Sequence, residues 1–166
     1  MVKTAHYRLL IYADKGVLRC ESLAKKLGIS VNTVKKYLRL LEREGMIKAS
    51  GIDAYVLTNR GMLLLKSLKN IAGATPPPYR VVDPISGELI PITIKNYLQL
   101  YVVIKYGLIP EDAVNAYIKS GDLIKWIEQH IGDLYLAEEV KKGRIKSARD
   151  LVEYLEKVIN LMRELK

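Results

Sequence analysis

The sequence predicts a mainly α protein of two domains, the first combining helices with a small β-hairpin and the second all α. Three observations lead to this fold class. Apolar residues recur every three or four positions along most of the 166-residue chain, which is the period of an amphipathic helix. Three consecutive prolines at positions 76–78 interrupt the pattern and cannot continue a helix. The balance of charge changes at the same place.

The excess positive charge is confined to the part of the chain before the prolines. Residues 1–75 contain 14 Lys and Arg but only five Asp and Glu, so this part carries the whole net charge of +9. The remainder has 13 basic and 13 acidic residues and is neutral. A segregated basic field attracts polyanions, whereas solubility alone does not require segregation. We expect domains at 1–72 and 92–166, joined by a Pro-rich and irregular segment over 73–91.

The first domain is expected to hold four helices and one hairpin. Gly28 ends the second helix, Ser30 is a suitable N-cap for the third, and Gly45 follows the third as its terminator. The expected helices are 4–12, 21–27, 31–44 and 59–71, and the expected strands are 46–48 and 55–58.

The second domain is expected to be helical. Residues 79–92 are assigned as mostly irregular, with a hairpin turning at Ser86 and Gly87. Pro110 suits the first turn of a helix, and Ser147 with Asp150 resembles a capping box. The expected helices are 94–106, 110–119, 122–131, 133–141 and 147–165.

The most informative stretch runs from residue 21 to residue 47. Its third-helix portion has two distinct faces. The apolar positions, spaced i, i+3, i+7 and i+10, form one buried stripe: Val31, Val34, Leu38 and Leu41. The polar positions, spaced i, i+4, i+7 and i+11, form a face with three positive charges: Asn32, Lys36, Arg39 and Arg43.

This polar face suits reading of the DNA major groove. Asn pairs with adenine, and Arg or Lys pairs with guanine. Thr33 and Lys35 flank the face near the helix start, whereas Lys25 and Lys26 on the preceding helix suit backbone phosphates. The candidate DNA-binding residues are Lys25, Lys26, Ser30, Asn32, Thr33, Lys35, Lys36, Arg39, Arg43 and Lys48.

Three segments resemble the winged helix-turn-helix family of bacterial and archaeal transcription regulators. They are LAKKLGIS (23–30), TVKKYLRLLEREGMI (33–47) and YVLTNRG (55–61), within roughly the first 71 residues. The resemblance implies that the second matching helix is a recognition helix and that the hairpin is the wing. One feature departs from the family, since wing tips that enter the minor groove often carry Arg or Lys. Here the tip is Ser50, Gly51, Ile52 and Asp53, a poor set for reading the minor groove. The wing is therefore expected either to contact the DNA backbone through Lys48 or to make no DNA contact, and protein binding by the module becomes a stronger alternative.

The last expected helix carries an apolar stripe of nearly three heptads. The stripe predicts either a homodimer across a two-fold axis or packing on the other helices of its domain, and the sequence leaves both open. The candidate dimerisation residues are Leu151, Leu155, Val158, Met162 and Leu165. Four aromatic residues, Tyr97, Tyr101, Tyr106 and Trp126, are interpreted as core rather than as the lining of a ligand pocket.

Nothing in the sequence points to an enzyme, a cofactor or a metal site. The lone Cys20 precludes an intramolecular disulfide and is interpreted as structural, and neither histidine has a partner at a metal-ligand spacing. With no signal peptide and no membrane-spanning run, we expect a soluble cytoplasmic protein. The composition, rich in Lys, Ile and Leu and poor in Gln, leans towards an archaeal or thermophilic source.

These features lead to one main hypothesis and two alternatives. The main one is a sequence-specific regulator of transcription that binds double-stranded DNA, as a homodimer or with a protein partner held by its second domain. The first alternative is a protein-interaction adaptor in a transcription, replication or partition complex. The second is a sensor whose second domain binds a small molecule.

Overall fold

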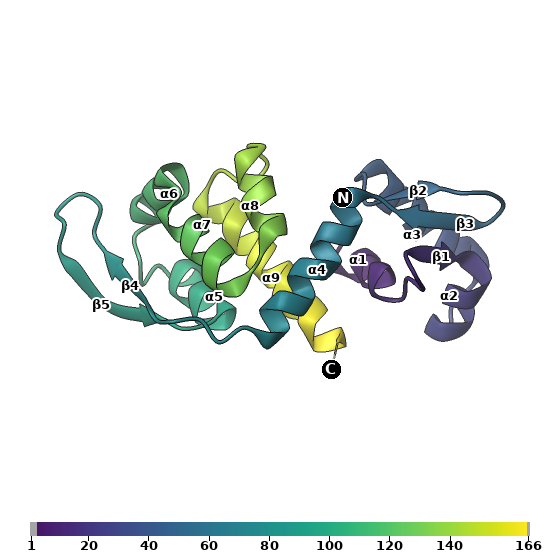
Figure 1. The fold of residues 1–166 in the computed structure, drawn as a ribbon, viewed down its shortest axis with the longest axis horizontal. Helices are drawn as coiled ribbons and strands as arrows, with labels where there is room; N and C mark the ends of the chain where they lie inside the picture. Colours follow the sequence, from purple (N-terminus) through teal and green to yellow (C-terminus); the bar gives the residue numbers. More distant parts are fainter. Residues whose placement is uncertain (1–2, 166) are drawn as a thin grey trace. The chain divides into compact units, whose positions relative to one another are not determined.

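The computed structural model describes residues 3–165, so that residues 1, 2 and 166 at the ends of the expected domains lie outside the description. The chain divides into two compact units (Figure 1). One comprises the chain up to Lys66 together with the residues from Arg163 on, and the other comprises Ser67–Met162. Helix α4 (Asn59–Gly73) contributes residues to both units.

The first unit packs helices on a three-stranded antiparallel sheet of β1 (Val17–Arg19), β2 (Ile47–Ala49) and β3 (Ala54–Leu57), in the order β1-β3-β2. The wing expected from the sequence is the hairpin of β2 and β3. The third strand, β1, was not expected, and it pairs with β3 by placing Leu18 opposite Tyr55. Besides the start of α4, the elements are α1 (Thr4–Ile11), β1 (Val17–Arg19), α2 (Cys20–Leu27), α3 (Val31–Arg43), β2 (Ile47–Ala49) and β3 (Ala54–Leu57).

The end of the sheet is tied closely to the helix that follows it. The Thr58 hydroxyl donates to the carbonyl of Gly45 (2.6 Å) and accepts from the backbone N–H of Gly61 (3.2 Å). A Cβ atom at Gly61 would collide with the backbone carbonyl of Met46. Glycine at position 61 therefore allows α4 to approach the segment between α3 and β2.

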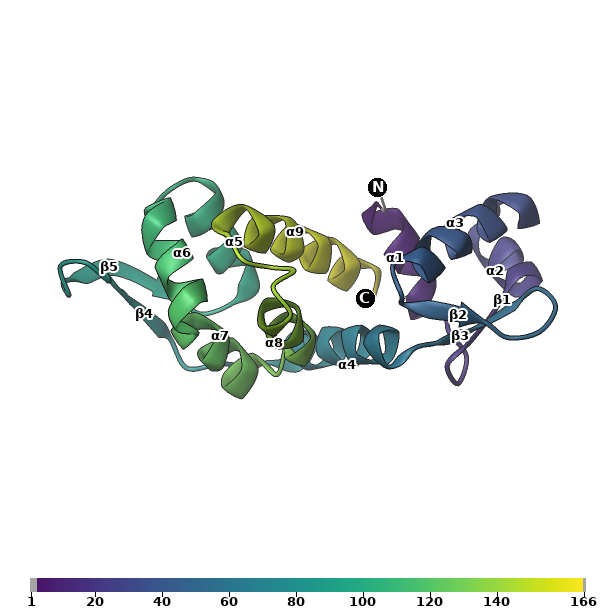
Figure 2. The same ribbon diagram turned by 90° about the horizontal axis from the view of Figure 1, so that it is seen from above.

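The second unit is a helical bundle with a two-stranded hairpin that extends from it, as both ribbon views show (Figures 1 and 2). The hairpin corrects the assignment of residues 79–92 as mostly irregular, although its turn includes the expected Ser86 and Gly87. Besides the end of α4, the elements are β4 (Tyr79–Val82), β5 (Leu89–Ile94), α5 (Tyr97–Lys105), α6 (Glu111–Ser120), α7 (Asp122–Trp126), a π-helical turn η1 (Ile127–Ile131), α8 (Leu134–Lys141) and α9 (Ala148–Glu164).

The Pro-rich segment is not a free linker. The indole Nε1–H of Trp126 donates to the carbonyl of Pro77 (3.2 Å), so this segment is held on the second unit. The second half of α4 is bound there as well, since the Ser67 hydroxyl accepts from the backbone N–H of Tyr135 (2.9 Å). The prolines therefore mark the end of a helix, and the division between the units falls inside that helix.

The apolar stripe of α9 lies inside the second unit as far as Met162. Leu151, Leu155 and Val158 are each 0% exposed, and Met162 is half-buried. Leu165 is 37% exposed and follows the end of the helix. Of the two interpretations left open by the sequence, this burial supports packing on the other helices of the unit, because fully buried side chains offer no surface to a second copy.

Candidate nucleic-acid interface

The turn between α2 and α3 sets the direction of the recognition helix. Gly28 adopts a left-handed conformation (φ 63°), which costs glycine little and other residues more. The backbone N–H of Ile29 then donates to the carbonyl of Ala24 (3.2 Å), which closes the end of α2. Two residues after Gly28, Ser30 caps α3 by accepting from the backbone N–H of Thr33 (3.1 Å). The two helices are thus joined by a short turn that is closed by hydrogen bonds at the end of α2 and at the start of α3.

Helix α3 has the two faces that the sequence predicted. Val34, Leu38 and Leu41 are each 0% exposed, and Val31 is half-buried. The opposite stripe consists entirely of exposed side chains, which we call the reading face: Asn32, Lys36, Arg39 and Arg43.

The cations of the reading face are not compensated by acids. Within residues 3–165, Lys36, Arg39 and Arg43 form no ion pair. Glu42, the acid in the last turn of the helix, is half-buried, and its carboxylate accepts from the backbone N–H of Ala49 (3.0 Å). The reading face therefore presents three uncompensated charges and one amide to solvent.

The remaining candidate residues lie on α2, at the start of α3 and on β2. Lys25 and Lys26 are exposed in the last turn of α2, and the Lys26 ammonium lies 5.9 Å from the ring centroid of Tyr12. Lys48 is exposed on β2. The hydroxyls of Ser30 and Thr33 are 2.8 Å apart, so each already has a partner within the protein.

Lys35 is in a different position from the other candidates. Its ammonium lies 2.7 Å from the carboxylate of Asp53 at the wing tip, so its charge is compensated within the domain. The neighbouring Ile52 is 94% exposed. The acid that the sequence placed at the wing tip thus faces the recognition helix, and an apolar side chain remains exposed.

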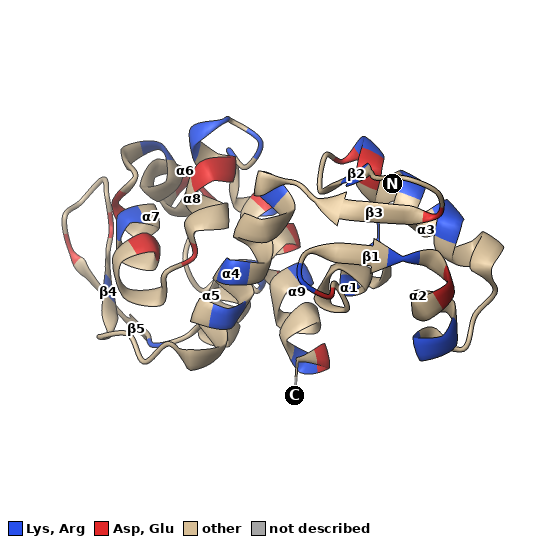
Figure 3. Cartoon of the chain, turned by 45° about the vertical axis from the view of Figure 1, so that its right-hand side comes forward, with Lys and Arg blue, Asp and Glu red and all other residues tan. Residues whose placement is uncertain are grey.

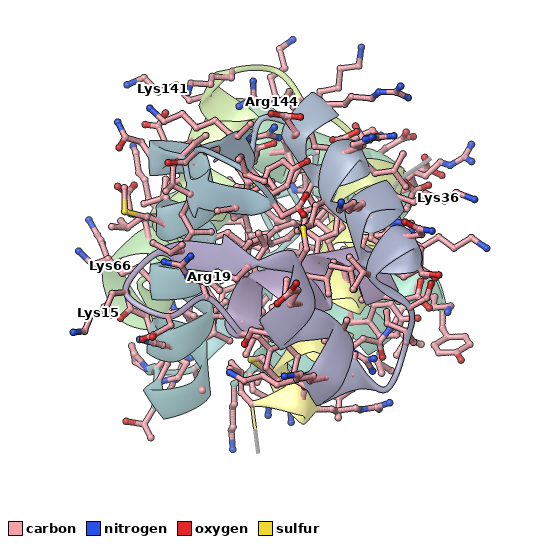
Figure 4. All side chains as sticks on the ribbon, turned by 90° about the vertical axis from the view of Figure 1, so that its right-hand side faces the viewer. Lys15, Arg19, Lys36, Lys66, Lys141 and Arg144 are labelled. Carbon is pink, nitrogen blue, oxygen red and sulfur yellow. The ribbon has the colours of Figure 1, made fainter. Side chains whose placement is uncertain are left out.

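Sequence reasoning missed the basic residues on and beside β1. Arg19 is exposed on this strand and Lys15 is exposed in the turn before it. Figure 4 shows Lys15 and Lys36 on opposite sides of the unit, so the positive charge is not confined to the reading face. The only signal was the pair Val17 and Leu18, which is too short to identify a strand.

The charges of the two units differ in pattern as well as in sum. In Figure 3, β1 carries a blue segment and α2 carries a blue and a red one, whereas both blue and red segments occur among the helices of the second unit. Several acids and bases there pair locally, and Arg144 donates through two nitrogens to the buried carboxylate of Glu139 (2.8 and 2.9 Å). The second unit therefore carries no net excess of positive charge, in contrast to the first.

The four aromatic residues considered for a ligand pocket do not act together. Tyr97 is buried and donates to Asp133, Trp126 packs against Tyr79 at 5.2 Å between ring centroids, and Tyr106 is 70% exposed. The Tyr101 hydroxyl accepts from Lys105. The burial and contacts of Tyr97 and Trp126 agree with their interpretation as core residues, whereas the exposure of Tyr106 shows that this interpretation was wrong for Tyr106.

Side chains that could act as nucleophiles or metal ligands are not arranged for either task within residues 3–165. Cys20 is 0% exposed at the start of α2, and burial raises the pKa of its thiol, which disfavours the reactive thiolate. Among residues 3–165, no three His, Cys, Asp or Glu side chains lie together in a group able to hold a metal ion. The helices of this same part of the chain include none that is long and apolar enough to cross a membrane.

Comparison with known families supports this description of the first unit. Residues 7–75 match the model of the winged helix-turn-helix family. The match spans α2, α3, the hairpin and α4, and the N-terminal segment is therefore a winged helix-turn-helix, a DNA-binding class of domain. Neither curated proteins nor solved structures give a significant match to the chain.

Proposed function

We propose that this protein is a sequence-specific regulator of transcription that reads double-stranded DNA with α3 in the major groove. The observation that carries the proposal is the reading face, where Asn32 and three uncompensated cations project from one side of a capped helix. Asn and Arg at such positions recognise base edges, and the lysines before the turn suit backbone phosphates. The regulators that the segment resembles are bacterial and archaeal, so the proposed location is the cytoplasm.

The experiment combines selection with affinity measurement. Selection from a random duplex pool should enrich a motif, and fluorescence anisotropy on that motif should show affinity that falls steeply with salt. Lys36→Ala and Arg39→Ala should each weaken binding by about 1–3 kcal/mol. Lys69→Ala, which removes the same charge from an exposed position on α4, is the matched control and should change affinity much less. Absence of duplex binding at low salt would refute the proposal.

The alternative is a protein-interaction adaptor, and one observation favours it. The β4–β5 hairpin exposes apolar side chains, with Ile85 89% and Leu89 60% exposed, which is a common property of protein-binding surfaces. An adaptor should bind DNA weakly, and the selection should then enrich no motif. A partner protein should in that case co-purify with the chain.

We further propose a binding role rather than a catalytic one. The groups with potential chemistry have other tasks in the fold: Cys20 is buried, and Asp133 and Glu139 are engaged by donors within their own unit. The second unit is proposed to hold a partner, either a second copy of the chain or another protein.

A further inference from the structure

The backbone fixes the position of Asp53 in the wing. Asp53 has a left-handed conformation (φ 53°), and its carbonyl accepts from the backbone N–H of Cys20 (3.0 Å) at the start of α2. The next residue, Ala54, pairs with Arg19 on β1 and accepts from the backbone N–H of Ser50 (2.9 Å). These backbone hydrogen bonds fix the main chain at Asp53 and therefore the point from which its carboxylate projects.

That carboxylate is directed at the recognition helix. The Oδ1 atom of Asp53 lies 2.7 Å from the Nζ atom of Lys35, and the two side chains are 46% and 33% exposed. The hydrogen bond that the Lys35 ammonium donates to the Asp53 carboxylate raises the pKa of Lys35, so the lysine stays charged while its charge is compensated. Lys36, the next residue along the helix, forms no ion pair within residues 3–165.

Compensation of one lysine has a consequence for DNA binding. Each cation that neutralises a phosphate releases counterions and adds about 0.9 to the magnitude of the salt slope, whatever the DNA sequence. If Lys35 turned to a phosphate, it would leave the Asp53 carboxylate unpaired beside a polyanion, and like charges repel. The pair therefore opposes recruitment of Lys35 by DNA, although an exposed ion pair contributes little to folding stability.

We propose that Asp53 is a positioning residue that holds Lys35 away from DNA phosphates and thereby lowers affinity for duplexes of any sequence. A phosphate contact can be made with any sequence, and base reading by Asn32 and Arg39 is not affected, so Asp53 lowers the sequence-independent part of the affinity and leaves the ratio of specific to non-specific binding unchanged. This inference rests on the proposed DNA-binding function. It reverses the assignment of Lys35 as a DNA contact.

The first test is Asp53→Asn, measured by anisotropy with a duplex of unselected sequence across a range of salt concentrations. Asparagine keeps the shape of the side chain and tolerates the left-handed backbone. We expect affinity at low salt to rise about tenfold and the magnitude of the salt slope to rise by about 0.9. The matched control is Glu21→Gln, which removes one exposed negative charge from α2 of the same domain and should have a much smaller effect.

The second test compares two neighbouring lysines. In the natural chain, Lys36→Gln should lower the magnitude of the salt slope by about 0.9. Lys35→Gln should lower it much less, because it gives up no phosphate contact and only leaves the Asp53 carboxylate unpaired. In the Asp53→Asn background, Lys35→Gln should reverse the gain in affinity. These substitutions lie on the surface of α3, so the comparison in the natural chain holds even if thermal unfolding shows that Asp53→Asn is misfolded.

The outcomes separate this inference from the proposed function. If Lys35→Gln lowers the slope of the natural chain as much as Lys36→Gln, or if Asp53→Asn behaves like Glu21→Gln, the role of Asp53 is refuted while DNA binding stands. If the natural chain binds no duplex at low salt, both proposals are refuted.

Discussion

At the scale of single residues, Asp133 is a buried carboxylate in the second unit that needs several hydrogen-bond donors. It is 0% exposed, and its carboxylate accepts from the hydroxyls of Tyr97 (2.6 Å) and Tyr154 (2.7 Å). It also caps α8 by accepting from the backbone N–H of Leu136 (3.0 Å). A buried carboxylate is tolerated only with such a set of donors, and here the donors come from α5, α8 and α9. One side chain thus joins three helices.

We expect Asp133→Ala to destabilise the protein by about 3–5 kcal/mol. The substitution leaves two buried hydroxyls and the first turn of α8 without an acceptor, and each such loss is costly. Denaturant unfolding followed by circular dichroism measures the change. Asp122→Ala removes an exposed carboxylate at the start of α7 and is the matched control, with an expected loss of about 1 kcal/mol or less. A similar loss in both variants would contradict the role of Asp133.

The burial of Asp133 also leads to a prediction about how the stability of the protein depends on pH. Burial raises the pKa of its carboxyl above the ordinary value, so the folded state binds a proton more readily than the unfolded state. Its contribution to stability is therefore fully present below the pKa of the unfolded state and is lost as pH rises through the folded pKa. Subtracting the unfolding profile of Asp133→Asn from that of the natural chain isolates this contribution. A difference that grows with rising pH would contradict the assignment.

At the scale of elements, α9 shows how a local signal starts a helix. The carboxylate of Asp150 accepts from the backbone N–H groups of Lys146 (3.0 Å) and Ser147 (3.1 Å), and the Ser147 hydroxyl accepts from the N–H of Asp150 (3.2 Å). This is the capping box that the sequence predicted. The N–H of Ala148 donates to the side chain of Asn115 on α6 (2.7 Å), a contact that no local pattern reveals.

We expect the Asp150 cap to be lost at low pH. The bond from the backbone N–H of Lys146 is the largest cause that lowers the pKa of Asp150. Its stabilisation is thus present above the unfolded pKa and disappears as pH falls through the folded pKa, below about pH 4. Asp150→Asn should cost about 1 kcal/mol or less at neutral pH and should remove part of the acid sensitivity. Thermal unfolding across pH tests this, with Glu153→Gln on the same helix as the control.

The elements of the first unit divide into those that local chemistry predicts and those that it does not. Helix α3 was predicted because Ser30, the apolar stripe and Gly45 all act within a few residues of one another. Strand β1 was missed because Val17–Arg19 is short and its partner β3 lies more than 30 residues later in the chain. The pairing of Asp53 with Lys35 was missed for a similar reason: it depends on a left-handed turn that neither residue specifies alone.

At the scale of the whole molecule, the first unit is positively charged and the second unit is neutral. The excess of nine positive charges was visible in the sequence, because it needs only counting. The limits of the units were not, because α4 continues from one into the other. The side chain of Asn70 donates to the carbonyl of Gly132 (2.9 Å), so the end of α4 packs with residues far along the chain. A proline run is therefore a better marker of where a helix ends than of where a packing unit ends.

The apolar stripe of α9 gives the last prediction. Leu155 is 0% exposed within its own unit, so Leu155→Ala should lower the free energy of unfolding by about 2–5 kcal/mol through loss of packing within the chain. The loss should be the same at low and high protein concentration, since stability that depends on a dimer varies with concentration. Leu165→Ala, in the same stripe but 37% exposed, should change stability by about 0.5 kcal/mol or less. If Leu155→Ala instead dissociated a dimer without destabilising the subunit, as judged by light scattering and denaturant unfolding together, α9 would be the seam between two copies. If Leu155→Ala destabilises the subunit as expected, any homodimer that reads paired half-sites must use a different surface.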